Sequence, residues 1–477
     1  MRTPPLRPTQ RARAALLGAA LLSLAAGCGA GGGERPDLLL ITVDTLRADF
    51  VSAFGRPGVR TPTLDRLARE GVVFARHYST SPYTAPSHAS LFTGLYPREH
   101  NLVHNGAALS PELIGLPGFL RDAGYRTAAS IGSRVVGSSF GFQHGFEAFD
   151  EDFSEGVQRP RGDTSHNQRY AGAVVDRALE LMEADDGRPL FLWVHLYDPH
   201  HPYAPPQPAP LELQRAKKLF GPRVEPSSLY DRQELIGFQT AYEAEVHYCD
   251  RQIGRLLAAW DARPGAGEDL VVFTSDHGEG LGEHGYLWHG VFLYEEALHV
   301  PLVLRGAGRL EGGRTVRTVT SAVDVAATVI ELLGFPGGEG PRGSSLLRFA
   351  GEGEPRAGAW AIAERYRQPG SHFSERGLPL AEGDSARDWE RYLDQELYAV
   401  VRDDWKAIRG TAGTVELYYL GRDPEEAVDL GGGGVEAERE LLGILDAWLE
   451  QAHPRVDALR GGGRADEVEE MLDDLGY

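Results

Sequence analysis

Short apolar runs alternate with amphipathic stretches along this chain, and this alternation constrains its fold more than any other feature. The run Asp37–Val43 is almost continuously apolar, which is typical of a strand covered on both faces. The similar runs further along are Leu190–Leu196, Leu270–Thr274 and Val300–Leu304. The helical patterns among them are Thr63–Glu70, Gln168–Ala184 and Glu234–Ala262. Strands that alternate with helices predict an α/β fold, in which a mostly parallel sheet is sandwiched by helices.

A change of composition after residue 336 predicts a domain boundary. Asp324–Leu333 has the pattern of a last helix, and the segment that follows, to about residue 358, is rich in Gly, Pro and Glu. The elements expected beyond it are a hairpin, Tyr398–Ile408 with Val415–Leu420, and a helix, Val435–Gln451. We therefore predict a catalytic domain over residues 37–345 and a small α+β domain with its tail over residues 358–477.

The first 36 residues differ from everything after them. The basic residues there are Arg2, Arg7, Arg11 and Arg13. They precede a short apolar run, Ala14–Ala26, which indicates a secretory signal. The cysteine at position 28 makes this segment resemble a bacterial lipoprotein signal, in which Cys28 becomes the lipidated first residue. We expect a signal peptide over residues 1–27 and a flexible tether over residues 28–36. An ordinary signal peptide with an incidental Cys28 is the alternative.

These features predict a protein of the bacterial cell envelope, periplasmic or facing the surface, which the lipid anchor holds to a membrane. The chain carries a formal net charge of −21, and loss of the leader makes it more acidic. Such a surface repels phosphate backbones, so we expect no nucleic acid partner. An acidic enzyme can still bind an anionic group when metal ions supply the positive charge. Cys249 is the only cysteine besides Cys28, so we expect no internal disulfide.

Two acidic residues follow predicted strands. Asp44 comes directly after the first strand, and Asp276 lies two residues beyond Thr274. Functional groups of a mostly parallel sheet gather at the carboxyl ends of its strands. His277 adds an imidazole in a glycine-rich loop. Two carboxylates and an imidazole suit one or two divalent ions, with Zn²⁺ or Mn²⁺ favoured.

Thr84 supplies a hydroxyl at a predicted loop-to-helix junction. Pro86 suits the first turn of a helix, and Gly94 suits its end. Thr84 is thereby placed at the helix N-terminus, where amides and the helix dipole favour an anion. A metal ion that acidifies this hydroxyl would make Thr84 a nucleophile, so we include it among the metal ligands. A plain helix cap is the alternative for Thr84 taken alone.

Several motifs resemble the sulfatase family of the alkaline phosphatase superfamily, over nearly all of the chain after the leader. The segments that carry the resemblance are Ile41–Asp49, Pro86–Pro97, Asp198–Tyr203, Ser275–Gly285, Tyr294–Glu296, Val300–Leu302, Leu417–Tyr418, Asp423–Glu425 and Leu475–Tyr477. The resemblance implies an alkaline phosphatase-like fold and metal-dependent hydrolysis or transfer of phosphate or sulfate esters.

Four positions depart from the familiar sulfatase pattern. Thr84 stands where those enzymes carry the Cys or Ser that is oxidised to formylglycine, and His88 stands where they carry Arg. Threonine is a secondary alcohol, so its oxidation would produce a ketone and the formylglycine mechanism is unavailable. Thr45 replaces an acidic metal ligand, and His277 often corresponds to Asn. Fewer oxygen ligands and one more nitrogen ligand argue against Ca²⁺.

These departures resemble the threonine-nucleophile branches of the superfamily, such as nucleotide pyrophosphatase/phosphodiesterases, phosphoethanolamine transferases and lipoteichoic acid synthases. The resemblance implies that His200 and His289 bind the substrate oxyanion or a second metal. We expect His88 to orient Thr84 or cap its helix.

The favoured function is therefore phosphodiester or phosphoryl chemistry through a metal-activated Thr84, on a small-molecule, lipid or glycan ester. Hydrolysis of sulfuric esters without formylglycine is one alternative. A non-catalytic envelope protein that binds ligands is another, although a binding protein needs neither Asp44 nor His277.

Overall fold

The computed structural model describes residues 35–451 with gaps at 56–57, 159–163, 207–231, 307, 339, 351–357, 368–391 and 393, together with residues 459–460. The predicted leader, Cys28 and the acidic tail lie outside the described residues. No helix among the described residues is long and apolar enough to cross a membrane.

A mixed sheet of eight strands forms the centre of the fold, in the order β15-β2-β14-β10-β1-β9-β5-β6. Its strands are β1 (Leu38–Val43), β2 (Val72–Phe74), β5 (Arg126–Ile131), β6 (Ala148–Asp150), β9 (Leu190–Leu196), β10 (Leu270–Ser275), β14 (Leu302–Gly306) and β15 (Arg314–Val316). Strand β1 runs parallel to both β9 and β10, and β5 runs parallel to β9 and β6. Only β14 runs against its neighbours, β10 and β2. The predicted mostly parallel sheet is thus confirmed.

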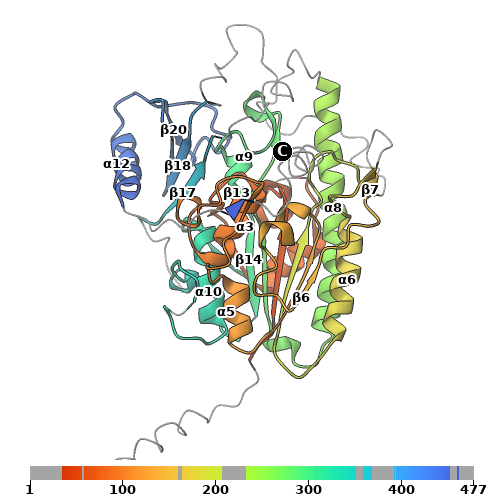
Figure 1. Ribbon diagram of the computed structural model, residues 1–477. Helices are drawn as coiled ribbons and strands as arrows, with labels where there is room; N and C mark the ends of the chain where they lie inside the picture. The colour runs from red at the N-terminus through yellow and green to blue at the C-terminus, as the bar shows by residue number, and fades with distance from the viewer. Residues whose placement is uncertain are drawn as a thin grey trace, which may run out of the picture. The chain divides into compact units, whose positions relative to one another are not determined.

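Helices cover both faces of this sheet (Figure 1). The helices concerned are α2 (Pro62–Glu70), α3 (Thr84–Thr93), α5 (Leu116–Asp122), α6 (Ala171–Glu183), α8 (Arg232–Asp261) and α10 (Val325–Leu332). On one face, Leu38 and Leu40 of β1 pack in a core with α3, α5 and α10. On the other, Leu39 and Ile41 pack with α2, α6 and α8. Successive strand residues point to opposite faces, so burial on both sides requires the nearly continuous apolar run of β1.

The predicted helices agree with the structure to within a few residues, whereas one predicted strand of the main sheet needs correction and strand β5 is not predicted at all. The run Val300–Leu304 becomes strand β14 only from Leu302 and is antiparallel to β10. Strand β5 carries Arg126 and Thr127 and has no long apolar run, which explains why periodicity does not predict it.

A second sheet of four antiparallel strands follows the main sheet in the chain. Its strands are β17 (Trp360–Arg365), β18 (Leu397–Arg402), β19 (Trp405–Gly410) and β20 (Val415–Tyr419). Helix α12 (Glu436–Glu450) packs on it through Leu441, Leu445 and Trp448. The predicted arm Tyr398–Ile408 is in fact two strands, because the chain turns at Asp403, where φ is +49°. Aspartate tolerates this left-handed conformation without a glycine to mark it.

A buried lysine connects this small sheet to the main part of the fold. Lys406 of β19 is completely buried, and its Nζ lies 3.1 Å from Oε1 of Glu295 and 2.9 Å from Oε1 of Glu426. Glu295 begins the short helix α9 (Glu295–Leu298), which follows the loop that carries His277 and His289. The two carboxylates compensate the buried ammonium, and both raise the pKa of Lys406 above its ordinary value.

We expect Lys406→Met to lower the free energy of unfolding by about 3–5 kcal/mol, because it leaves the buried Glu426 without its cation. Urea denaturation followed by circular dichroism measures the loss. Adding Glu426→Gln to the same protein removes the stranded carboxylate and should recover most of the stability. A loss for the single variant below about 1 kcal/mol would contradict this role for the ion pair.

Candidate metal centre and active site

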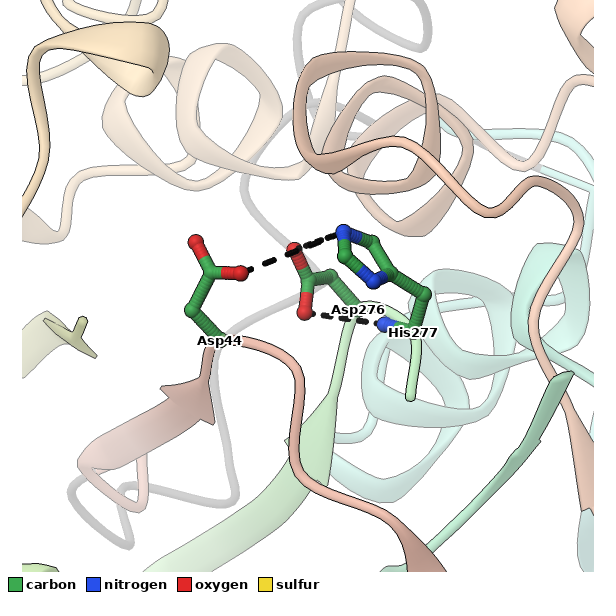
Figure 2. Close-up of side chains that lie close together, drawn as sticks. All are labelled: Asp44, Asp276 and His277. Carbon is green, nitrogen blue, oxygen red and sulfur yellow. Dashed lines mark hydrogen bonds and ion pairs between the residues drawn. The ribbon is translucent and has the colours of Figure 1, made fainter. Parts of the chain in front are cut away.

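Asp44 and Asp276 lie side by side because their strands are paired in register. Val43 pairs with Ser275 at the carboxyl ends of β1 and β10, so the next residue of each strand emerges at the same edge. Figure 2 shows the side chains of Asp44, Asp276 and His277 turned toward one another. Nε2 of His277 lies 3.9 Å from Oδ1 of Asp44 and 3.4 Å from Oδ2 of Asp276. One ligand atom from each residue lies within 4.8 Å of the other two, and all three residues are buried.

The hydrogen bonds around this cluster leave its ligand atoms available for a cation. Oδ1 of Asp276 accepts from the amides of His277 (2.8 Å) and Thr45 (3.2 Å), whereas its Oδ2 is buried with no hydrogen-bond partner among the described residues. Both carboxylate oxygens of Asp44 are likewise buried with no hydrogen-bond partner among the described residues. Nδ1 of His277 lies 3.0 Å from the carbonyl oxygen of Gly278 and therefore donates, which leaves the lone pair on Nε2. Buried anionic oxygens facing an imidazole lone pair fit a divalent metal, and the mixed O and N donors suit Zn²⁺ or Mn²⁺.

The pKa of Asp44 shows the electrostatic cost of this arrangement without a cation. Burial raises this pKa well above its ordinary value of 3.8, and the carboxyls of Asp276 and Glu279 raise it further. The Thr84 hydroxyl and the Thr45 amide lower it by smaller amounts. A raised carboxyl pKa stabilises the fold at a pH below 3.8, and that contribution is lost as the pH rises through the folded-state pKa.

Metal-free Asp44→Asn should therefore be more stable at pH 7.5 than the metal-free wild type, since it lacks the buried charge. We expect a rise in Tm of about 1 °C for each kcal/mol relieved, measured by thermal unfolding in chelator. Addition of Mn²⁺ should raise the Tm of the wild type and not that of the variant. A metal-free variant that melts at or below the wild type at every pH above 5 would rule out this account.

Thr84 is the first residue of α3 and is completely buried. Its Oγ1 lies 3.1 Å from Nε2 of His277, so the hydroxyl adjoins the proposed metal centre. The helix ends at Gly94, whose φ is +68° and where a Cβ would lie 1.9 Å from the carbonyl oxygen of Arg342. Glycine is thus required at this position, and the predicted limits of the helix are correct.

His88 lies one helical turn after Thr84. Its Nδ1 is 2.9 Å from the carbonyl oxygen of Thr84, its Nε2 is 3.2 Å from Oγ1 of Thr42, and its ring lies 3.7 Å from Oδ2 of Asp276. It is completely buried, which lowers its pKa. His88 therefore lies behind Thr84, and its orienting role stays a prediction.

The structure also brings His200 and His289 together, with ring centroids 4.9 Å apart. His289 lies 4.5 Å from the ring of His277, and its Nδ1 is 3.0 Å from Oε1 of Glu279. The other oxygen of Glu279 accepts from the Tyr203 hydroxyl at 3.0 Å. Burial lowers the pKa of both histidines well below its ordinary value. The two imidazoles therefore adjoin the metal cluster.

Asn105 is a site residue that sequence reasoning does not find. Its Oδ1 accepts from the amide of Ala85 at 2.9 Å, at the first turn of α3. Its Nδ2 is buried with no hydrogen-bond partner among the described residues. An amide donor fixed beside Thr84 is suited to bind an oxyanion. A lone asparagine in a loop carries no periodicity or motif that predicts this.

The side chains of Thr45 and Asp198 hydrogen-bond to backbone groups and not to the residues of the candidate metal centre. Thr45 Oγ1 donates to the carbonyl oxygen of Pro199 at 2.5 Å, and its backbone is left-handed with φ at +52°. Oδ2 of Asp198 accepts from the amide of Ala171 at 2.7 Å, at the start of α6. Burial raises the pKa of Asp198 to about 7. These contacts give Asp198 a structural role at the helix N-terminus.

Known proteins resemble this chain in both sequence and structure. The protein-family model for sulfatases matches residues 36–335. The multifunctional alkaline phosphatase superfamily protein PehA of Trinickia caryophylli is 31% identical over 405 residues, which cover 67% of this chain and 78% of PehA. The N-acetylglucosamine-6-O-sulfatase of Bacteroides thetaiotaomicron is 24% identical over 88% of this chain and 87% of its own.

Two solved structures confirm an alkaline phosphatase-like fold with a small antiparallel sheet at its C-terminal end. The phosphonate monoester hydrolase of Agrobacterium radiobacter superposes with a TM-score of 0.69 at 24% identity, over 87% of this chain and 95% of that one. A protein solved with its substrate D-glucosamine-2-N,6-O-disulfate superposes with a TM-score of 0.68 at 22% identity, over 87% and 98%.

Proposed function

Because this chain belongs to the sulfatase family of ester hydrolases, we propose that it cleaves or transfers phosphate esters, phosphodiesters above all, with Thr84 as its nucleophile. The observation that carries the proposal is the position of the Thr84 hydroxyl, buried at the N-terminus of α3 and 3.1 Å from Nε2 of His277. A threonine cannot become formylglycine, so a route through an unmodified alkoxide is required. Phosphoryl groups suit that route, because a phosphothreonine can be released by a second displacement.

Asp44, Asp276, His277 and Thr84 would hold the metal, which when bound acidifies a hydroxyl and polarises the ester. Oγ1 of Thr84 then forms a bond to phosphorus, and the bond from phosphorus to the leaving oxygen breaks. Water, or an acceptor alcohol in a transferase, attacks the phosphothreonine in line and restores the hydroxyl.

The remaining residues act on the charge that develops on the phosphoryl oxygens. Nδ2 of Asn105 is a donor beside the nucleophile. An anionic substrate favours the protonated forms of His200 and His289, which can then donate to its oxygens or to the leaving group. Glu279 lies 3.0 Å from Nδ1 of His289 and orients that ring. A second metal at this histidine pair is the other role consistent with its position.

Hydrolysis of sulfuric esters by the unmodified threonine is the second candidate. It is favoured by the relatives, which include the N-acetylglucosamine-6-O-sulfatase described above. A sulfated threonine, however, lacks the easy release that a formylglycine hydrate provides.

We further propose that the mature protein is anchored by lipid at Cys28 in the bacterial cell envelope. The arginines before the apolar run Ala14–Ala26 and the cysteine after it support this placement. Metabolic labelling with a palmitate analogue, compared between wild type and Cys28→Ala, tests it directly.

The substrate class is tested with the purified protein, loaded with Zn²⁺ or Mn²⁺, on bis-aryl phosphate, aryl phosphate, aryl phosphonate and aryl sulfate. The proposal expects the diester to have the highest kcat/KM and a phosphothreonine to be trapped at Thr84 by acid quench and mass spectrometry. Turnover of the sulfate alone would establish the second candidate. No turnover of any ester together with no metal binding would support a ligand-binding protein instead.

A further inference from the structure

His195 is a completely buried histidine near the carboxyl end of its strand. It lies in β9, a strand whose other side chains are apolar, and Thr42 of β1 is its register partner. Its Nδ1 lies 3.1 Å from Oγ1 of Thr42. Its Nε2 is buried with no hydrogen-bond partner among the described residues, as is Nε2 of His77, so what lies next to this nitrogen distinguishes the two histidines.

That second nitrogen points at the metal centre. Nε2 of His195 lies 3.6 Å from Oδ2 of Asp44, and neither atom has a hydrogen-bond partner among the described residues. His195 does not belong to the compact set of Asp44, Asp276 and His277, whose ligand atoms lie within 4.8 Å of one another. Its place is thus behind a metal ligand.

Thr42 connects His195 to the helix that carries the nucleophile. Its Oγ1 accepts from Nε1 of Trp193 at 3.0 Å and also contacts Nε2 of His88 at 3.2 Å. His88 in turn contacts the carbonyl oxygen of Thr84 through its other nitrogen. The rings of His88 and His195 also meet edge to face, with centroids 4.7 Å apart. The buried Thr42 hydroxyl therefore links His195, which lies next to Asp44, to His88, which lies next to Thr84.

We propose that His195 is a positioning residue of the metal centre: its imidazole packs against the Asp44 carboxylate and limits that side chain to its ligating orientation, while Thr42 ties the imidazole to α3. Partners behind metal ligands of this kind fix the ligand's orientation, and their loss typically costs 10- to 100-fold in metal affinity. The proposal rests on the metal centre of the proposed function and not on the substrate, so it holds for a phosphate or a sulfate ester alike.

Two substitutions test the roles of the two ring nitrogens separately. The amide of His195→Asn reaches about as far as Nδ1, so it can keep the contact with Thr42 but loses Asp44. The longer His195→Gln reaches about as far as Nε2, so it can keep the contact with Asp44. His77→Asn is the matched control, because His77 is also completely buried and also contacts a threonine, with Nδ1 3.1 Å from Oγ1 of Thr320.

Affinity for Zn²⁺ and Mn²⁺, measured by competition with a chelator in the absence of substrate, is the readout. We expect His195→Asn to bind about 10- to 100-fold more weakly than wild type, and His195→Gln to recover to within a few-fold. His77→Asn should bind metal as the wild type does, whatever its effect on the Tm of the metal-free protein.

Wild-type metal affinity in His195→Asn, with only a lowered Tm, would overturn the proposal and leave His195 as a core residue. Equal losses in His195→Asn and His195→Gln would also count against a contact specific to Nε2. If neither variant folds, Thr42→Val decides, since it preserves the volume and His195 itself. Unchanged metal affinity in Thr42→Val would then overturn the proposed link. Failure of all esters in the substrate comparison would bear on the proposed function alone.

Discussion

Thr84→Ala is expected to lower kcat/KM for the preferred ester by roughly 10⁴-fold or more, while metal affinity falls by no more than about 10-fold. In the proposed mechanism the hydroxyl oxygen forms the covalent bond, and loss of a nucleophile removes a whole pathway from an enzyme. The three remaining ligands, Asp44, Asp276 and His277, stay in place. Steady-state kinetics on the bis-aryl phosphate and metal titration of the same sample measure both effects.

Two further variants make this result specific to Thr84. Thr84→Ser keeps a hydroxyl and should remain within about 100-fold of the wild type, with a trapped phosphoserine in place of phosphothreonine. Thr93→Ala removes a buried hydroxyl at the other end of α3, which donates to the carbonyl oxygen of Ala89 at 2.6 Å. It should alter stability more than turnover. Substantial activity in Thr84→Ala would show that a metal-activated water attacks the ester directly.

Asp276→Asn is expected to weaken metal binding by at least about 100-fold and to abolish turnover without unfolding the protein. Oδ1 of Asp276 accepts from two backbone amides, at His277 and Thr45. The amide oxygen of the asparagine will take that place, because only an oxygen can accept those hydrogen bonds. Its NH₂ group must then point at the metal, where it offers protons instead of a lone pair.

Asp250→Asn is the matched control for burial. Asp250 is also buried, and its carboxylate accepts from the amides of Thr63 (3.1 Å) and Leu64 (2.9 Å) at the start of α2. This variant should lose stability, since a capping carboxylate becomes a neutral amide, and should keep metal affinity. Calorimetric titration with Mn²⁺ and thermal unfolding of both proteins provide the comparison. Metal affinity in Asp276→Asn that matches the wild type would refute the assigned metal centre.

Several residues of the candidate site can be predicted before the fold is known. Asp44 and Asp276 follow apolar strands, and parallel strands end at a common edge, so their meeting follows from the pattern alone. Thr84 is similarly located by Pro86 and Gly94, which mark the two ends of its helix. The chemical consequence of threonine at this position requires no structure either, because it depends only on the oxidation state that a secondary alcohol can reach.

Local patterns fail where a position depends on a partner far along the chain. His195 looks like one polar residue in a buried strand until the register places it opposite Thr42, 153 positions away. Asn105 has no motif, and its relevance appears only when its amide meets the first turn of α3. The turn at Asp403 has no glycine to signal it, since a left-handed aspartate occupies the position.

Sequence alone therefore determined the class of fold and the residues at the ends of strands and helices, because periodicity and turn chemistry are local properties of the chain. The family entered through the resemblance of its motifs to the sulfatases. Only the tertiary structure decided which buried side chains lie against these site residues. Glu279 beside His289, Asn105 beside Thr84 and His195 behind Asp44 are brought together by packing, and contacts over these separations have no signature in a linear pattern.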